Sequence, residues 1–339
     1  MEPRRRPRLT PAIADVRRAV RAALPPPPVG PVESLVLVAL SGGPDSLALA
    51  AAAAFEAQRA GIRAGAIVVD HGLQPGSADV AARAVQQARD LGLDPVGSVV
   101  VTVDGYGGPE AAARTARYAA LDRAAKDAHA SVVFLGHTLD DQAETVLLGL
   151  ARGSGPTSLH GMSPSTRSGI IGTTYARPLL GIRRATTVQF CIDSALEPWI
   201  DPQNSDETFS RVRVRGTVLP MLERELGPGV AEALARTAEQ LREDSDALDH
   251  FAAEIAEELA DLAESGISLP VRALASNPAA LRQRLIRLAV ESEFHVSLSR
   301  AQTLDVARLV THWHGQKALD LPGVRVERQG GLLIFTATE

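Results

Sequence analysis

The chain contains very little cysteine and few aromatic residues. Its 339 residues include a single cysteine, Cys191, which excludes an internal disulfide and any site ligated by several cysteines, such as a structural zinc site. Aromatic residues make up only 4% of the sequence, so there is little material for stacking platforms. A reducing, cytoplasmic compartment is expected from this composition.

Long apolar runs and an excess of positive charge are also missing. The longest apolar stretch, at 35–55, is interrupted by Gly42 to Asp45, and residues 1–20 lack the apolar core of a signal peptide. We therefore expect no membrane partner. The formal net charge of -5 argues against wholesale nonspecific binding of nucleic acid, although local basic patches remain compatible with it.

Short β-branched runs alternate with helical patterns in the first part of the chain. The runs "SLVLVAL", "AGAIVVD", "VGSVVVTV" and "SVVFLG" indicate buried strands, and helical patterns follow near 45–60, 77–91, 109–129 and 139–150. This alternation predicts an α/β fold with an open, mostly parallel, doubly wound sheet. Ligands of such sheets bind beyond the carboxyl ends of the strands.

The remaining segments suggest a three-part organisation. An amphipathic helix near 10–23 and the proline-rich "PPPPVGP" form an N-terminal segment, 1–30. An α/β domain is expected over 31–216, with a further strand near 171–177 and a helix near 182–195. A mainly helical C-terminal domain is expected over 217–339, with helical patterns at 229–265, 278–293 and 299–311 and a terminal hairpin around a Gly-Gly pair.

The loop after the first predicted strand has the composition of a phosphate-binding turn. Its glycines allow backbone N–H groups to approach an anion, and the following helix directs the positive end of its dipole to the same place. The lysine-bearing pattern of nucleotide-hydrolysing loops is absent from the sequence. An acid in the loop would repel phosphates unless a metal ion intervened. The loop comprises Ser41, Gly42, Gly43, Pro44, Asp45 and Ser46.

Polar residues also follow the second strand and occupy the helix expected at 109–129. Asp70 and His71 stand at the ligand edge of the sheet, although a loop acid beside a loop histidine needs no function. In "PEAAARTARY", Arg114 and Arg117 share a helical face with Glu110. An ion pair four residues apart accounts for Glu110 and Arg114 but leaves Arg117 unexplained.

A pair of acids follows the fourth strand, in "LGHTLDDQAETVLL". Thr138 and Asp141 fit a helix-capping pattern, which gives Asp141 a structural explanation. Glu144 has none, and two like charges three residues apart disfavour a helix. A cation between Asp141 and Glu144 would remove that repulsion.

Taken in order over residues 34–220, these motifs resemble the pyrophosphate-loop ATP pyrophosphatases, and among them the tRNA(Ile)-lysidine synthase family. The motifs that carry the resemblance are SGGPDS, VDHGL, PEAAARTARY, GH-x-x-x-DQ-x-ET, the glycine-rich ARGSGPTSLHGM, RPLL and DPQNSDETFSRVRVR. The family pattern has asparagine where this chain has Val212. Arg211 and Arg215 match, and would share a helical face, although the alternation of "RVRVR" alone is also typical of a strand.

The resemblance implies an adenine nucleotide alpha hydrolase-like fold and a ligase that uses ATP and Mg²⁺. Such an enzyme adenylates C2 of the wobble cytidine in isoleucine tRNA with a CAU anticodon. Free L-lysine then displaces AMP to form lysidine. The C-terminal domain is expected to position the tRNA, and homodimers occur in the family.

The resemblance also implies roles for individual residues. The residues expected to bind ATP are the whole 41–46 loop together with Asp70, His71, Gly136 and His137. The catalytic candidates are Asp45, Arg114, Arg117 and Arg211, with Asp45 also the candidate Mg²⁺ ligand. Lysine binding falls to Asp141 and Glu144, and tRNA binding to Arg152, Arg211 and Arg215.

Two other functions remain open at this point. A tRNA thiolation enzyme shares the fold, although one cysteine far from the loop counts against it. A noncatalytic protein that binds tRNA or nucleotide would explain the basic segments but would leave Asp45, Asp141 and Glu144 without a role.

Overall fold

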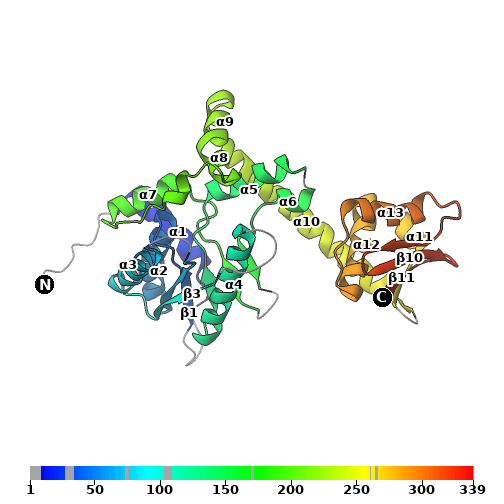
Figure 1. The fold of residues 1–339 in the computed structure, drawn as a ribbon, viewed down its shortest axis with the longest axis horizontal. Coiled ribbons are helices and arrows are strands. Elements are labelled where there is room, and N and C mark those ends of the chain that lie inside the picture. Colours follow the sequence, from blue (N-terminus) through cyan, green and yellow to red (C-terminus); the bar gives the residue numbers. More distant parts are fainter. Residues whose placement is uncertain are drawn as a thin grey trace. The chain divides into compact units, whose positions relative to one another are not determined.

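A computed structural model describes residues 9–26, 34–72, 76–102, 109–153, 155–168, 172–259, 261–263 and 266–338. The chain forms two compact units, Met1–Glu239 and Gln240–Glu339 (Figure 1). Most of the expected proline-rich link lies outside the described residues. The proposed division into an N-terminal segment, a catalytic domain to residue 216 and a C-terminal domain stays a prediction.

The first unit is built on a six-stranded sheet with the order β3-β2-β1-β4-β6-β5. All neighbouring strands are parallel except β5, which pairs with β6 in the antiparallel sense. The strands are β1 (Leu35–Ala39), β2 (Arg63–Asp70), β3 (Val96–Val100), β4 (Val132–Phe134), β5 (Ser165–Arg167) and β6 (Thr174–Ala176). The predicted mostly parallel sheet is confirmed, and β5 is an addition to it.

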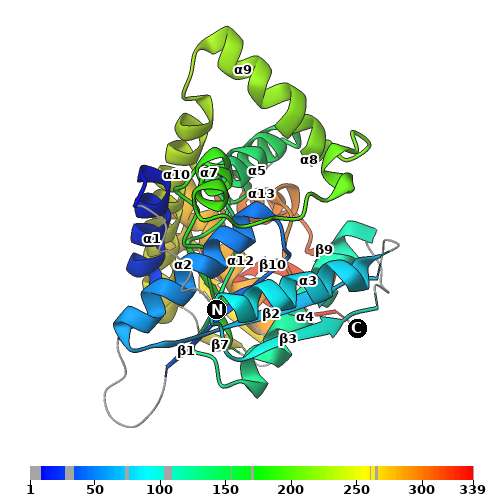
Figure 2. The same cartoon turned by 90° about the vertical axis from the view of Figure 1, so that its left-hand side faces the viewer.

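Helices cover both faces of this sheet because its strands alternate buried side chains between two cores. Val36 and Val38 face the core made with α1 (Pro11–Ala23), α2 (Pro44–Ala60), α3 (Ser77–Asp90) and α7 (Arg184–Asp193). Leu35 and Leu37 face the opposite core with α4 (Pro109–Asp127). Helix α1 packs beside α2, as both views show (Figure 1 and Figure 2). The predicted doubly wound arrangement is confirmed.

The order of the strands reverses at β1, which lies between β2 and β4. The loops that follow β1 and β4 therefore meet at one edge of the sheet, where ligands of such folds bind. Gly136, in the loop after β4, approaches the start of α2 closely. A Cβ there would lie 3.1 Å from both the N and the Cα of Ser46.

A mostly helical segment completes this unit beside α5 (Leu139–Ala151). It comprises α6 (Pro156–Leu159), a 3₁₀ turn (Pro202–Ser205), α8 (Ser210–Arg213), a π-helical turn (Val214–Val218), α9 (Leu219–Leu226) and the start of α10 (Val230–Leu259). Leu219 and Ala231 pack against Leu139 and Ala143 of α5. The arginine-rich stretch is thus helical, as the i,i+4 interpretation required, and the strand suggested by its alternation is wrong.

The second unit combines helices with a five-stranded antiparallel sheet of order β7-β8-β11-β10-β9. Its strands are β7 (Asp261–Ala263), β8 (Gly266–Pro270), β9 (Leu319–Leu321), β10 (Val324–Gln329) and β11 (Leu332–Ala337). Its remaining helices are α11 (Val271–Ser276), α12 (Ala279–Phe294) and α13 (Arg300–Thr311). The predicted helices and the Gly-Gly hairpin are confirmed, except that the helix expected over 229–265 ends at Leu259 and residues 261–263 form β7. The expectation of a mainly helical domain missed β7 to β9, because strands of three to five residues are too short to show a period of two.

Among the described residues, no helix combines the length and the apolarity that crossing a membrane would need.

Candidate functional site

The loop between β1 and α2 is held in a fixed shape by its own serines. The Ser46 hydroxyl accepts a hydrogen bond from the N–H of Ser41 at 3.1 Å and donates one to the carbonyl of Gly43, also at 3.1 Å. Gly42 has a φ of +83°, in the region that favours glycine. Gly43 is the N-cap of α2 and has no side chain to accept from the first N–H groups, while Pro44 occupies the first turn. These first-turn N–H groups can therefore meet an anion.

This loop borders a cleft of about 680 Å³ at the carboxyl edge of the sheet. The cleft brings together the loop after β1, the end of β2 and the loop after β4, as the strand order requires. Its lining includes the predicted residues Ser41, Gly43, Pro44, Asp45, Ser46, Asp70, His71, Arg117, Gly136, His137, Asp141 and Arg215. It also includes Arg184 and the segment from Asp201 to Asn204, together with Trp199.

Helix α5 begins at the cleft with a complete capping box. The Asp141 carboxylate accepts from the backbone N–H of Thr138 at 2.8 Å, and the Thr138 hydroxyl accepts from the N–H of Asp141 at 3.4 Å. The predicted capping role of these two residues is confirmed. The neighbouring Asp140 accepts from the N–H of Arg184 at 2.7 Å and so joins the starts of α5 and α7.

Glu144 lies one turn further along α5, and its side chain is 0% exposed. Arg215 binds it through two hydrogen bonds, Nε to Oε1 at 2.7 Å and Nη2 to Oε2 at 3.1 Å. Arg211 donates to Oε2 at 3.1 Å and also to the Thr145 hydroxyl at 2.8 Å. The cations expected beside this acid are therefore present within the chain, in the form of guanidinium groups. A π-helical turn between α8 and α9 carries Arg215, and such turns are frequent at functional sites.

Arg184 links the two acids of α5 to the acid of the loop. Its Nη2 donates to Oδ1 of Asp141 at 2.7 Å, its Nη1 to Oε1 of Glu144 at 3.2 Å and its Nε to Oδ2 of Asp45 at 3.3 Å. We call the whole set the acid–arginine cluster; it consists of Asp45, Asp141, Glu144, Arg184, Arg211 and Arg215.

The cluster controls the charge of its own members. Burial alone would lower the pKa of Arg184, but the carboxylates of Asp141, Glu144 and Asp45 raise it above its ordinary value. Burial alone would raise the pKa of Asp141, but Arg184 and hydrogen bonds from Thr138 bring it below its usual range. Arg184 therefore stays a cation and Asp141 an anion at neutral pH.

Asp45 behaves differently from Asp141. Burial raises the pKa of the Asp45 carboxyl above its ordinary value, although hydrogen bonding by Thr187 and the charge of Arg184 oppose this. Its Oδ1 hydrogen-bonds the Thr187 hydroxyl, and its Oδ2 faces Arg184. No group of three or more His, Cys, Asp or Glu side chains that could hold a metal ion occurs among the described residues. A single carboxylate beside a phosphate loop nevertheless suits Mg²⁺, which takes one or two carboxylates together with substrate phosphates.

Two neutral imidazoles, of His71 and His137, and the buried guanidinium of Arg117 line the cleft. Burial lowers the pKa of His137 to about 3, with Arg177, Arg117 and Arg211 acting in the same sense and Asp141 opposing them. Burial and Arg117 lower the pKa of His71. The Nδ1 atoms of both histidines are buried without a hydrogen-bond partner among the described residues. Buried polar atoms without a partner inside a cleft indicate room for a polar ligand.

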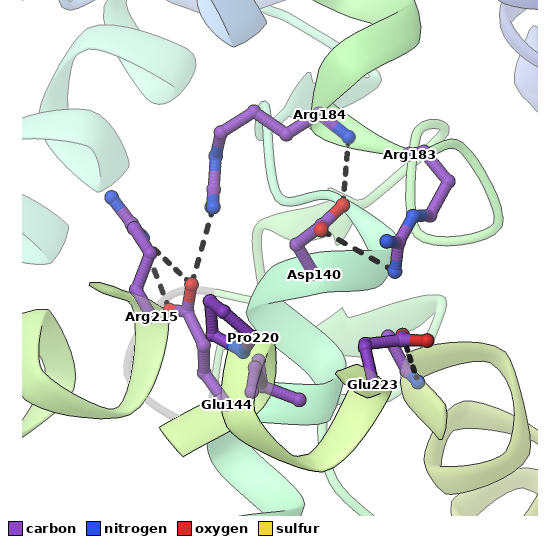
Figure 3. A pocket seen from close by; sticks show the side chains of 9 residues that line it. Asp140, Glu144, Arg183, Arg184, Arg215, Pro220 and Glu223 are labelled. Carbon is purple, nitrogen blue, oxygen red and sulfur yellow. Dashed lines mark hydrogen bonds and ion pairs between the residues drawn. The ribbon is translucent and has the colours of Figure 1, made fainter. Parts of the chain in front are cut away.

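A second cavity, of about 270 Å³, lies behind the acids of α5. Figure 3 shows Arg183 and the backbone of Arg184 directed at Asp140, with Arg215 and the Arg184 guanidinium directed at Glu144. Arg184 and Arg215 line this cavity and also the larger cleft. The acid–arginine cluster thus separates the two spaces.

Three other predicted residues, Arg114, Arg152 and Asp70, lie outside the acid–arginine cluster, although Asp70 lines the cleft. Arg114 is exposed, and its guanidinium lies 4.9 Å from the centre of the Tyr118 ring. Arg152 is exposed at the end of α5. Asp70 is buried, and its Oδ1 accepts from the N–H of Gly72 at 2.9 Å. The roles assigned to these residues, and to the other site residues, stay predictions.

Sequence reasoning missed Arg184 and Thr187 altogether. A signal for Arg184 was present, because an arginine in the first turn of a helix opposes the helix dipole and calls for acidic neighbours. The sequence does not indicate which acids compensate the charge of Arg184, since Asp45 lies 139 positions away in the chain.

Comparison with known proteins identifies two family matches in this chain. A family model described as a PP-loop domain matches residues 15–222, and one described as the TilS substrate binding domain matches residues 269–333. Among solved structures, a U34-tRNA thiolase from Methanococcus maripaludis aligns with a TM-score of 0.56 over 68% of this chain and 80% of its own. Its sequence is 22% identical, so the likeness establishes the fold alone.

Curated relatives match almost the whole chain. The tRNA(Ile)-lysidine synthase of Leifsonia xyli is 65% identical over 311 residues, which cover 91% of this chain and 92% of the relative. That of Thermobifida fusca is 50% identical over 330 residues, 96% of this chain and 98% of the relative. With the phosphate loop, the cleft and both family matches in place, the resemblance seen in the motifs is confirmed: the chain belongs to the tRNA(Ile)-lysidine synthase family.

Proposed function

We propose that this protein joins free L-lysine to the wobble cytidine of isoleucine tRNA with a CAU anticodon, in an ATP-dependent ligation. ATP first transfers its adenylyl group to O2 of the cytosine and releases pyrophosphate. The ε-amine of lysine then attacks C2, and AMP leaves to give lysidine. The observation that carries the proposal is that the phosphate loop and Asp141 line one cleft. Arg184 and Arg215 join Glu144 to Asp141 there.

The loop suits a reaction at the α-phosphate of ATP. Backbone N–H groups at the start of α2 and the hydroxyl of Ser41 can hold the β- and γ-phosphates without a lysine. Ser46 contributes by keeping the loop in shape through its hydrogen bonds to Ser41 and Gly43. Pyrophosphate is then the group that the loop retains as the bond to the α-phosphate breaks. Arg117 lines the same cleft and can stabilise the charge that develops there.

Mg²⁺ is proposed as the metal that accompanies ATP, with Asp45 as the protein carboxylate that contacts it. The ion would neutralise phosphate charge during adenylyl transfer. Asp45 is turned towards Arg184 and Thr187 by the contacts described above. Those contacts hold its carboxylate at the first turn of α2, beside the phosphate-binding N–H groups.

Asp141 and Glu144 are proposed to bind the lysine substrate, as carboxylates suited to an ammonium group. Three arginines are proposed to contact tRNA phosphates. They are Arg152, whose guanidinium is exposed, and Arg211 and Arg215 near the cleft. The match of residues 269–333 to a substrate-binding domain supports a role for the second unit in holding the tRNA. A homodimer stays a proposal without a contact to support it.

The test is an in vitro reaction with ATP, Mg²⁺, radiolabelled lysine and tRNA transcripts. Lysine should enter a CAU isoleucine transcript and not a CAU methionine transcript, with pyrophosphate released in step. The Asp45→Ala variant should release no pyrophosphate, while Asp79→Ala, which changes an aspartate on α3, should match the wild type. Absence of lysine incorporation at saturating ATP and Mg²⁺ would refute the proposal.

The same assay separates the other two functions. A noncatalytic binding protein would bind ATP and tRNA but release no pyrophosphate. A thiolation enzyme would release pyrophosphate without taking up lysine. The single cysteine, Cys191, is buried, and burial raises its pKa to about 12, so it is unsuited to carry sulfur as a thiolate.

A further inference from the structure

The acid–arginine cluster already balances the charge of the acids proposed to bind lysine. It contains three carboxylates, from Asp45, Asp141 and Glu144, and three guanidinium groups. Glu144 is fully buried, and Asp141 has a side chain only 13% exposed. An incoming ammonium group would therefore add an uncompensated charge to this partly desolvated site. For lysine to bind tightly to the acids, one of the three arginines has to leave them.

Of the three arginines, Arg184 is the one that also contacts an acid of the phosphate loop. Arg211 and Arg215 come from one helical segment, and their hydrogen bonds described above go to residues of α5. Arg184 comes from α7 and already contacts the phosphate loop through Asp45, at 3.3 Å. Like Arg215, it lines the cleft that contains the loop. An anion bound in the loop would attract the Arg184 guanidinium away from Asp141 and Glu144.

We propose that Arg184 couples the two substrate sites, occupying the lysine-binding acids until the phosphates of ATP draw it towards the loop. Arg184 is thus a positioning residue that makes ATP the first substrate to bind and lysine a later one. This inference rests on the proposed function. Because coupling between two ligands is reciprocal, lysine also raises the affinity for the nucleotide by the same factor.

The coupling can be measured by binding alone, without turnover. Isothermal titration of lysine into the full-length protein is carried out with and without α,β-methylene-ATP and Mg²⁺, because the methylene bridge prevents adenylyl transfer. The wild type should bind lysine roughly 5- to 150-fold more tightly in the presence of the analogue, the range usual for coupled sites. Inorganic pyrophosphate should give part of this effect, and adenosine should give none.

Arg184→Gln removes the competing cation. This variant should bind lysine without nucleotide about as tightly as the wild type does with it, so that the coupling factor falls to about 1. Arg184→Lys keeps the charge but loses the planar fork that reaches three acids, and should retain part of the coupling. The matched control is Arg183→Gln, the neighbouring arginine, which contacts Asp140 and Glu232 instead. It should keep the wild-type coupling.

Several outcomes would overturn the inference. These are equal lysine affinity with and without the analogue in the wild type, unchanged coupling in Arg184→Gln, or an equal effect of adenosine. If Arg184→Gln does not fold, the wild-type comparison of pyrophosphate with adenosine and the Arg184→Lys variant still decide. Wild-type protein that makes lysidine but shows no coupling refutes this inference alone, whereas protein that neither binds lysine nor makes lysidine refutes the proposed function with it.

Discussion

Glu144 and Arg215 form a two-bond ion pair in which the carboxylate is completely shielded from solvent. Nε of Arg215 lies 2.7 Å from Oε1, and Nη2 lies 3.1 Å from Oε2. Arg184 and Arg211 contact the same carboxylate, so Glu144 joins three separate guanidinium groups at one point. Besides any contact with substrate, an acid in this position holds the segments around the cleft together.

Glu144→Gln is therefore expected to lower the free energy of unfolding by about 3–5 kcal/mol, the usual result of removing one partner from a buried ion pair. The amide has nearly the shape of the carboxylate, so the loss reports charge and hydrogen bonding. Urea denaturation at pH 7 measures it.

The control for that change is Glu225→Gln, which removes the acid of an exposed pair with Arg224. Exposed pairs contribute less than about 1 kcal/mol. Similar midpoints for both variants would show that Glu144 is not the anchor described above.

The family resemblance implies the same catalytic role for Arg117 and Arg114, but the surroundings of the two side chains differ. Arg117 lines the cleft, and burial lowers its pKa, whereas Arg114 is exposed over Tyr118. Arg117→Gln should reduce the rate of pyrophosphate release by about 10²–10³-fold, as is usual when a group that stabilises developing charge is removed.

Arg114→Gln changes the same residue type one turn earlier on the same helix. Its rate of pyrophosphate release should stay within about tenfold of the wild type, since its guanidinium does not line the cleft. Equal losses in the two variants would mean that Arg114 also reaches the reacting atoms.

Much of this architecture follows from local sequence patterns. Short β-branched runs predicted four of the parallel strands, and the capping pattern predicted the contact between Thr138 and Asp141. The pairing of Arg184 with Asp45 and Glu144 could not be predicted, because the positions lie 139 and 40 residues apart and meet only through the sheet order. Strand β5 could not be predicted for another reason: its three residues are exposed and show no apolar alternation.

Gly136 provides a test of how closely the two cleft loops must approach each other. A Cβ at this position would lie 3.1 Å from backbone atoms of Ser46, so either the loop or the start of α2 has to shift. Gly136→Ala should weaken binding of ATP by about 1–3 kcal/mol, the typical penalty of overpacking, as measured by isothermal titration.

Gly181→Ala is the matched control, because a Cβ there meets no atom within 4 Å. It should bind ATP as the wild type does. Unchanged affinity in Gly136→Ala would show that the phosphate loop tolerates displacement.

His137 should make the folded protein less stable in mild acid. Its pKa in the folded state is lowered to about 3 from an ordinary value of 6.5, mainly by burial. Between these two values the unfolded chain binds a proton that the folded protein does not, so stability falls as the pH falls. For one proton the slope approaches about 1.4 kcal/mol per pH unit.

The measurement is the free energy of unfolding of the wild type and of His137→Asn between pH 7 and pH 4. Asparagine cannot be protonated, so its stability relative to the wild type should improve steadily as the pH decreases through this range. Well above pH 6.5 the histidine is neutral in both states and contributes no pH dependence. Parallel curves for the two proteins would mean that His137 titrates in the fold as it does in the unfolded chain, and that the cleft neither desolvates it nor places it among arginines.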